Sequence, residues 1–221
     1  MLGIIKEISI IKTIMFNFHY FEPQRAIHFP VLVGRNIYLG NMGERGSLIL
    51  GIEKMGAIQL GLSAGSFRKC NGGGYWNHSG CGVIEFCGTA IFPKDAKINV
   101  TKGGNLVIGN NFTSNSNVLI SCEEKIVCSE DTLLGWNVSI LDGDGHTIRN
   151  GNREVVNEAK PIFIGKHTWI SSGVTILKGT TISEGCVIGA NSTVSGKFEE
   201  CNSLIVGVPA RKVKQNITWE R

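Results

Sequence analysis

The chain has 221 residues, of which 42% are hydrophobic and 18% charged, with 29 glycines and five prolines. This length fits one domain with its own core, and the composition argues against a disordered chain and predicts many tight turns. The net charge of +4 comes from scattered Lys and Arg residues. We therefore expect no nucleic-acid partner.

The N-terminal residues are apolar but are interrupted by Lys6, Glu7 and Lys12, which argues against a signal peptide or a membrane span. We expect a separate helical element over residues 1–22 that packs on the rest of the chain, on a neighbouring subunit or on a membrane surface. The seven cysteines form no CxxC pair. This odd number disfavours a disulfide framework or a zinc ribbon and indicates a reducing, cytoplasmic location.

Residues 46 to 100 contain short apolar runs separated by glycines, without a clean period. Runs such as "SLILGIEKMGAIQLGL" and "GVIEFCGTAIF" are typical of short strands joined by turns. We interpret this region as irregular coils of the repeat that follows it.

A strict six-residue period occupies the next region, where aliphatic residues recur at Ile164, Ile170, Ile176, Ile182, Ile188 and Val194. Between them, Gly or Asn stands at four of six equivalent positions, as corners with positive φ would favour. A period of six fits neither an α-helix nor an open sheet. It predicts coils of about 18 residues, each with three short faces, which stack into parallel sheets around an aliphatic core.

The same frame continues upstream at Cys128, Leu134 and Ile140. Between Ile120 and Cys128 the interval is eight, so we expect a wider corner there. In this frame Cys128 and Cys186 occupy inward positions, where a small buried thiol is expected rather than a metal ligand.

Between Ile140 and Ile164 the interval is 24, and the intervening sequence is polar. This pattern predicts a protruding loop, residues 142–161, that returns to the coil in register. Long polar loops on a rigid repeat commonly carry function. The loop begins with "DGDGH", in which His146 follows a run of glycines and aspartates.

Three stretches, "DGDGHTI", "IGKHTWISSGVTIL" and "SLIVGVPARKVK", resemble the hexapeptide-repeat acyltransferases of the left-handed parallel β-helix type. The likeness is greatest to sugar and polysaccharide O-acetyltransferases of the galactoside and maltose type, and is specific over residues 98–214. It implies an all-β, left-handed parallel β-helix domain over residues 23–214, after the element at 1–22 and before a C-terminal tail at 215–221. It also implies a homotrimer with active sites between subunits.

The resemblance implies that His146 is the general base, which takes the proton from an acceptor hydroxyl as that hydroxyl attacks acetyl-CoA. An imidazole with a pKa of about 6.5 suits this task at neutral pH. Asp142 or Asp144 would orient the imidazole or stabilise its cation, although aspartates beside glycines are also ordinary turn residues. Asn115 would lie near the acceptor and His146, or be a plain corner residue. Glu123 and Asp142 would bind the acceptor.

The resemblance also implies a groove for coenzyme A. Its thioester end would lie at Trp169 and Ser172, with Ser172 a donor to the tetrahedral oxyanion. Its adenine and phosphate end would lie at four residues of "GVPARKVK": Pro209, Ala210, Arg211 and Lys214. Cationic side chains at this mouth would attract the phosphates of the coenzyme.

The implied function is acetyl transfer from acetyl-CoA to a hydroxyl of a sugar, in a bacterial surface polysaccharide or its lipid-linked precursor, without a metal. N-acetylation of an amino sugar or of another small acceptor is an alternative, since the same base and coenzyme site would serve. A non-catalytic β-helix scaffold is another. A zinc enzyme of the γ-carbonic anhydrase type would need three converging histidines, whereas the regular region holds only His146 and His167.

Overall fold

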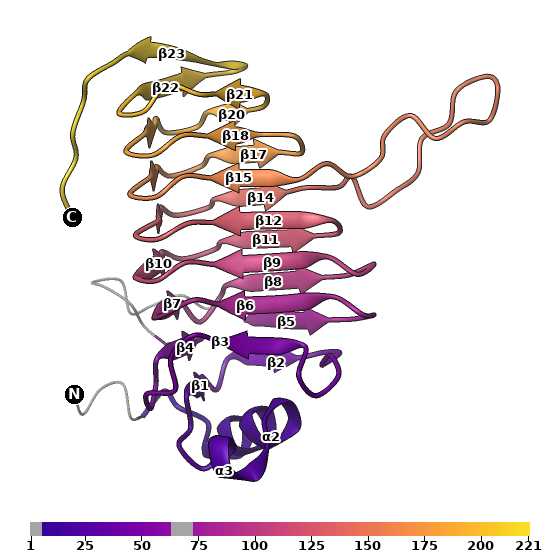
Figure 1. Cartoon of the computed structure of the whole chain (residues 1–221), viewed down its shortest axis with the longest axis vertical. Helices are drawn as coiled ribbons and strands as arrows, with labels where there is room; N and C mark the ends of the chain where they lie inside the picture. Colours follow the sequence, from indigo (N-terminus) through magenta and orange to yellow (C-terminus); the bar gives the residue numbers. More distant parts are fainter. Residues whose placement is uncertain (1–5, 63–72) are drawn as a thin grey trace.

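A computed structural model describes residues 6–62 and 73–221. The parts of the sequence predictions that fall on residues 1–5 and 63–72 lie outside this description. The described strands wrap around one long axis as a three-sided, left-handed parallel β-helix (Figure 1). The predicted fold class is therefore confirmed, including the irregular coils before residue 100.

Three sheets form the three sides, and each takes every third strand of the coil. Sheet 1 contains β1 (Val31–Val33), β4 (Ile58–Leu60), β7 (Ala90–Phe92), β10 (Phe112–Ser114), β13 (Leu133–Leu134), β16 (Trp169–Ile170), β19 (Val187–Ile188), β22 (Leu204–Gly207) and β23 (Ala210–Lys214). Sheet 2 contains β2 (Ile37–Leu39), β5 (Gly74–His78), β8 (Lys97–Val100), β11 (Leu119–Cys122), β14 (Ser139–Leu141), β17 (Thr175–Leu177) and β20 (Thr193–Val194). Sheet 3 contains β3 (Leu48–Leu50), β6 (Val83–Phe86), β9 (Asn105–Ile108), β12 (Lys125–Cys128), β15 (Ile162–Ile164), β18 (Thr181–Ile182) and β21 (Lys197–Phe198).

The corners between the sheets have the backbone conformation that the repeat predicts. Gly173, Gly179 and Gly185 have φ of 73°, 75° and 70°, and Asn191 has φ of 57°. Left-handed φ is costly for residues with a Cβ but open to Gly and tolerated by Asn. The small residues at these corners therefore let the chain turn sharply from one sheet to the next.

The coils are longer in the N-terminal half than in the C-terminal half. Trp169 pairs with Val187, so the C-terminal coils contain 18 residues, whereas Tyr75 pairs with Lys97, 22 residues later. The eight-residue interval lies in another coil, in which Leu119 pairs with Ser139, 20 residues later, and residues 123–124 join β11 to β12. The two extra residues predicted from this interval are thus confirmed, but the link between β11 and β12 is only two residues long, and both strands have four residues.

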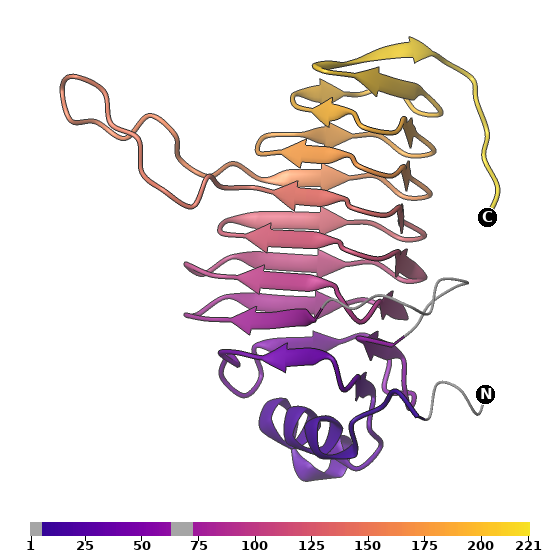
Figure 2. The same ribbon diagram turned by 180° about the vertical axis from the view of Figure 1, so that it is seen from behind.

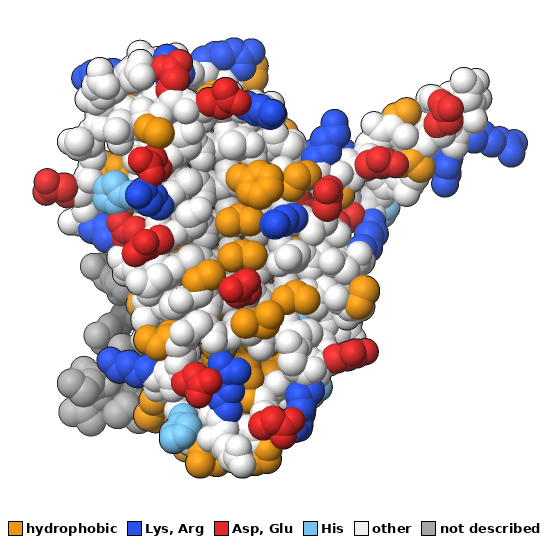
Figure 3. Space-filling model, in the orientation of Figure 1, with side chains coloured by type: hydrophobic (Ala, Val, Ile, Leu, Met, Phe, Trp, Pro, Cys, Tyr) orange, Lys and Arg blue, Asp and Glu red, His pale blue; other side chains and the backbone are white. Residues whose placement is uncertain are grey.

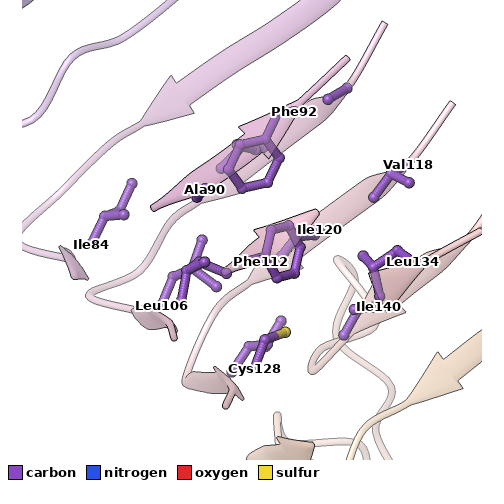
Figure 4. Packing of buried hydrophobic residues seen from close by; sticks show 14 of the residues in the cluster. Ile84, Ala90, Phe92, Leu106, Phe112, Val118, Ile120, Cys128, Leu134 and Ile140 are labelled. Carbon is purple, nitrogen blue, oxygen red and sulfur yellow. The ribbon is translucent and has the colours of Figure 1, made fainter. Parts of the chain in front are cut away.

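Aliphatic and aromatic side chains from all three sheets fill the interior as one core (Figure 4). Ile84 and Leu106 are paired in register on neighbouring coils of sheet 3 and are both fully buried. Cys128 and Cys186 are also fully buried, as predicted, and burial raises the pKa of the Cys128 thiol to about 12. Each buried aliphatic residue stabilises the coil by about 2 to 5 kcal/mol relative to alanine.

The N-terminal end of the coil is closed by helix α2 (Ile10–Tyr20), followed by the short helix α3 (Pro23–Ala26). The Asn17 side chain accepts a hydrogen bond from the Val31 N–H (3.2 Å) and donates one to the Val31 carbonyl (2.7 Å). It therefore provides hydrogen-bond partners for the backbone of β1, the edge strand of sheet 1. Apolar side chains on the other side of α2 face solvent, among them Ile10 and Ile11.

Under α2 lies a buried polar network that contains a histidine. The Tyr20 hydroxyl accepts a hydrogen bond from Trp76 Nε1 (3.1 Å) and lies 3.1 Å from His78 Nδ1. His78 Nε2 lies 2.8 Å from the Gly82 carbonyl, so Nε2 carries the proton and Nδ1 accepts from Tyr20. Because the imidazole is fully buried, desolvation lowers the pKa of His78.

The C-terminal end is closed by the antiparallel pair β22–β23, after which residues 215–221 run back along the coil (Figure 2). This tail is extended rather than helical. Trp219 stacks on the corner residue His167, with ring centroids 4.2 Å apart, and Arg221 pairs with Asp131 at 2.9 Å. Partial burial acts to raise the pKa of Asp131, but hydrogen bonds from His167 and Arg221 hold that pKa below its usual value.

No helix in the part of the chain that the structure describes is long and apolar enough to cross a bilayer.

Candidate functional site

Residues 142–161 leave the coil after β14 and rejoin it at β15, and they form the long protrusion in Figure 1. Asp144 holds the protrusion to the coil, because its Oδ2 accepts hydrogen bonds from Lys178 Nζ (2.6 Å) and Asn157 Nδ2 (2.8 Å). Asn157 Nδ2 also donates to the His146 carbonyl (2.7 Å). The bond from Lys178 is the largest cause that holds the pKa of Asp144 below its usual value.

Asp142, predicted to bind the acceptor, makes structural hydrogen bonds at the base of the loop. Its side chain is fully buried, with Oδ1 accepting from the Glu123 N–H (2.7 Å) and Oδ2 from the Glu124 N–H (2.9 Å). A carboxylate engaged in this way provides hydrogen-bond acceptors for the two backbone N–H groups between β11 and β12. Asp142 thus fixes the base of the loop, and its binding to the acceptor stays a prediction.

His146 is exposed on the loop and faces a hollow of about 220 Å³ that Glu123 also lines. Glu123 is mostly buried, with 13% of its side chain exposed, and it pairs with Lys102 at 2.7 Å. Among the described residues, none hydrogen-bonds the His146 ring, so its nitrogens are open to a ligand. The structure thus brings the predicted base and the predicted acceptor residue Glu123 to one hollow.

Asp144 does not contact the His146 imidazole, because its carboxylate is committed to Lys178 and Asn157. Its effect on His146 passes through Asn157, which binds both the Asp144 side chain and the His146 backbone. These bonds give Asp144 a part in positioning the loop, and direct orientation of the ring by Asp144 stays a prediction. Lys178 and Asn157 could not be found from the sequence, since neither belongs to a motif. Lys178 reaches the loop from the next coil, and Asn157 meets Asp144 only when the loop folds back on itself.

The predicted coenzyme residues lie at a different part of the coil. Trp169 is exposed on the outer face of sheet 1, and Ser172 follows it at the corner that leads to sheet 2. Asn115 occupies the same corner after β10, with its side-chain amide donating to the Leu134 carbonyl (3.2 Å). This contact ties Asn115 to the next coil, as a corner asparagine would be.

The β22–β23 turn continues this corner toward the C-terminal end. Pro209 lies in the turn and Ala210 is buried against the last coil, with 1% of its surface exposed. Arg211 and Lys214 are exposed, and neither forms an ion pair with any residue the structure describes. Lys212 between them pairs instead with Glu200. Arg211 donates a hydrogen bond to the Ala210 carbonyl (2.7 Å), and both cationic side chains are free of carboxylate partners among the described residues.

Within one chain, the two predicted halves of the site lie apart. Ser172 precedes strand β17, whereas Lys178, which holds the loop through Asp144, follows that strand. Asn115 and Glu123 are likewise separated by β11. The loop with His146 and the corner with Ser172 therefore stand at opposite ends of the strands of sheet 2.

No group of three or more His, Cys, Asp or Glu side chains suited to a metal ion occurs within residues 6–62 and 73–221. The six described cysteines are all free thiols, three of them buried.

Comparison with known families gives a match over residues 161–196 to the bacterial transferase hexapeptide (six repeats). The chain belongs to the hexapeptide-repeat family. The matched region of this hexapeptide-repeat protein begins at the end of the protruding loop and covers the coils that carry Trp169 and Ser172.

The hexapeptide-repeat protein is similar to several proteins named as acetyltransferases. It is 31% identical over 131 residues to the putative lipopolysaccharide biosynthesis O-acetyl transferase WbbJ of Escherichia coli K12, covering 53% of this chain and 66% of WbbJ. It is 34% identical over 114 residues to galactoside O-acetyltransferase of the same strain, covering 51% and 55%. It is 37% identical over 108 residues to polysialic acid O-acetyltransferase of Neisseria meningitidis, covering 48% and 50%. The chain thus spans half to two thirds of these relatives.

Among solved structures, the polySia specific acetyltransferase NeuO superposes with a TM-score of 0.65 at 20% identity, over 84% of this chain and 72% of NeuO. This likeness extends the shared fold well beyond the matched hexapeptides.

Proposed function

We propose that the chain is an acetyltransferase that moves an acetyl group from acetyl-CoA to a hydroxyl of a saccharide in bacterial surface polysaccharide biosynthesis. The observation that carries the proposal is the loop, which holds the unpartnered imidazole of His146 over a hollow shared with Glu123. The names of the matched relatives, O-acetyltransferases of lipopolysaccharide biosynthesis, of galactosides and of polysialic acid, support this substrate class.

In this proposal His146 acts as the general base. A neutral imidazole nitrogen takes the proton from the acceptor hydroxyl while the hydroxyl oxygen attacks the thioester carbonyl of acetyl-CoA. The carbon–sulfur bond then breaks, and the imidazolium returns its proton to the leaving coenzyme A thiolate. The Ser172 N–H has no hydrogen-bond partner in the described residues, so it is the proposed donor to the tetrahedral oxyanion.

Acetyl-CoA is proposed to lie along the corner that carries Ser172 and the β22–β23 turn. Trp169 offers an exposed ring at one end of this corner, and the free side chains of Arg211 and Lys214 offer positive charge at the other. Phosphate groups are bound most strongly where cationic side chains are not already paired.

A complete site is proposed to form between copies of the chain in a homotrimer, because one chain places His146 and Ser172 at opposite ends of sheet 2. The outer face of sheet 3 supports self-association, since Val107, Val127 and Phe163 are paired in register there. An apolar band runs along the face seen in Figure 3, and Phe163 keeps 38% of its surface exposed. Apolar stripes of this kind commonly mark subunit contacts.

The domain organisation is proposed as a helical element at 1–22, a β-helix over 23–214 with its loop at 142–161, and a tail at 215–221. We place the protein in the cytoplasm, where acetyl-CoA is made and where thiols stay reduced. The outward face of α2 is the proposed contact with another protein or with a membrane surface that carries lipid-linked acceptors.

The experiment that tests the proposed function is calorimetric titration with acetyl-CoA, followed by transfer assays with sugar acceptors. We expect micromolar to sub-millimolar binding and release of coenzyme A only when a hydroxylated sugar is present. Faster transfer to an amino sugar would favour N-acetylation. A folded protein that binds no acetyl-CoA would leave a β-helix scaffold as the function.

A further inference from the structure

We infer that the acceptor is an oligosaccharide or polysaccharide chain, and that its neighbouring sugar units lie along the outer face of sheet 2 between the loop and Tyr75. This inference rests on the proposed acetyl transfer and specifies its substrate class. It assigns a binding role to Tyr75, Asn99 and Ser121, which lie outside the three stretches that resemble acetyltransferases.

A hollow of about 570 Å³ runs over this face of sheet 2. Its walls include Tyr75, Asn99, Ser121 and Leu141 from successive strands, and the overhanging loop closes one end. Glu123 lines both this hollow and the smaller one that holds His146. The two hollows therefore adjoin at Glu123, Asp144 and Gly145, so a ligand that reacts at His146 can extend past these residues over sheet 2.

Asn99 and Ser121 line the hollow and belong to a ladder of side-chain hydrogen bonds that begins at Asn77, beside the hollow. Asn77 Nδ2 donates to Asn99 Oδ1 (2.8 Å), and Asn99 Nδ2 donates to Ser121 Oγ (3.0 Å), because these residues are paired in register. Within the ladder Asn99 uses one N–H and one lone pair, so a second donor and a second acceptor position remain. Fixed amides with spare capacity suit the hydroxyl groups of sugars, which both donate and accept.

At the far end of the hollow stands an aromatic platform. The Tyr75 ring stacks on the Tyr38 ring, with centroids 5.7 Å apart and planes 10° from parallel. The Tyr75 hydroxyl lies over Gly40, where any Cβ would come within 2.7 Å, so glycine there permits this ring position. Since Tyr38 covers one face of the ring, the other face points along the sheet toward Lys97. Tyr75 keeps 37% of its surface exposed, and the exposed part of such a ring can contact the apolar C–H face of a sugar ring.

The length of the hollow excludes a single sugar unit as its full occupant. Tyr75 on β5 and Leu141 on β14 are three strand spacings apart, which is about 14 Å. This span exceeds the width of one sugar ring, so a free monosaccharide beside His146 would leave Asn99 and Tyr75 without a partner. A chain of several units would fill the hollow from the loop to the aromatic platform.

The test is retention on an array of bacterial glycans that range from single units to long chains. Wild-type protein is compared with Tyr75→Ala and Asn99→Ala. The control is Phe18→Ala, because Phe18 on α2 is an aromatic residue with the same exposed fraction, 37%, as Tyr75 and lies outside the hollow. Calorimetry with acetyl-CoA and the mass of the assembly are measured on every variant.

We expect wild-type and Phe18→Ala proteins to retain glycans of three or more units at least tenfold better than single units. Tyr75→Ala and Asn99→Ala should lose that preference while they keep acetyl-CoA affinity and assembly mass. Equal retention of single units and chains, no retention of any glycan, or normal retention by Tyr75→Ala would overturn the inference. A changed assembly mass in Tyr75→Ala would also overturn it, because the face would then be a subunit contact. Failure of the proposed function looks different: wild-type protein would not bind acetyl-CoA.

Discussion

The protruding loop and the coil corner that carries Ser172 hold the two halves of the proposed chemistry, and they are built differently. The corner is fixed by the repeat, since every coil is hydrogen-bonded to the coils before and after it. The loop is mostly exposed and depends on a few side chains, with Asp142 at its base and Asp144 and Asn157 along its length.

A rigid repeat can therefore form the groove proposed for acetyl-CoA. It cannot by itself place the catalytic base next to that groove in the same chain. The strands of sheet 2 separate the Ser172 corner from the loop corner in every coil. In the proposed homotrimer, a loop that leaves the coil can reach the corner of another copy. Variants at His146, Asp142 or Arg211 should each change one region and leave the other intact.

Replacing the base should have the largest effect. We expect His146→Ala to lower turnover by on the order of a hundredfold or more, because proton removal from the hydroxyl is lost. Since the ring is exposed and lacks a hydrogen-bond partner among the described residues, the melting temperature and the affinity for acetyl-CoA should not change. Steady-state kinetics measure the turnover, and calorimetry measures the melting temperature and the affinity for acetyl-CoA. Turnover at the wild-type level would remove His146 from the mechanism.

Removing the loop anchor should mainly affect stability. Asp142→Ala leaves the buried N–H groups of Glu123 and Glu124 without an acceptor, at a cost of about 2 to 3 kcal/mol in the free energy of unfolding. Denaturant unfolding monitors the loss. Asp144→Ala is the matched control: its ion pair with Lys178 is partly exposed and should contribute less than about 1 kcal/mol. Equal costs for the two variants would contradict the anchor role of Asp142.

Charge reversal at the β22–β23 turn should weaken the binding of acetyl-CoA alone. We expect Arg211→Glu combined with Lys214→Glu to raise the KM for acetyl-CoA roughly tenfold, because two unpaired cations near the phosphates become anions. The KM for the acceptor should stay within about twofold. Lys212→Glu is the control, because that lysine already pairs with Glu200. A larger change in acceptor KM than in acetyl-CoA KM would place the coenzyme elsewhere.

The smallest expected effect is the pH dependence of stability that comes from the N-terminal end, which is remote from both halves of the site. Burial lowers the pKa of His78 in the folded state, so the unfolded chain binds more protons below about pH 6.5. The stability of the wild-type protein should therefore fall as pH decreases through that value. The stability of His78→Gln should fall less steeply over the same range. Melting temperatures from pH 8 to pH 5 measure this slope. Parallel slopes for the two proteins would show that His78 does not contribute.

The coil could be predicted from sequence because its information is local: the six-residue period sets the inward residues, and Gly or Asn marks corners such as Gly173 and Asn191. The loop could be located because it breaks that period. Its internal contacts could not be predicted, since Asp144 and Lys178 are far apart in sequence and meet only when coils stack. For the same reason the docking of Trp219 on His167 gave no signal in the sequence.

The most direct test of the central claim, that one site combines two copies of the chain, is complementation in mixed assemblies. His146→Ala protein and the Arg211→Glu/Lys214→Glu double variant are co-expressed and assayed at low acetyl-CoA concentration. If each site takes its loop from one copy and its corner from the next, random mixing restores about a quarter of wild-type activity. Activity no higher than the average of the two parent variants would contradict the claim and place both halves in a single chain.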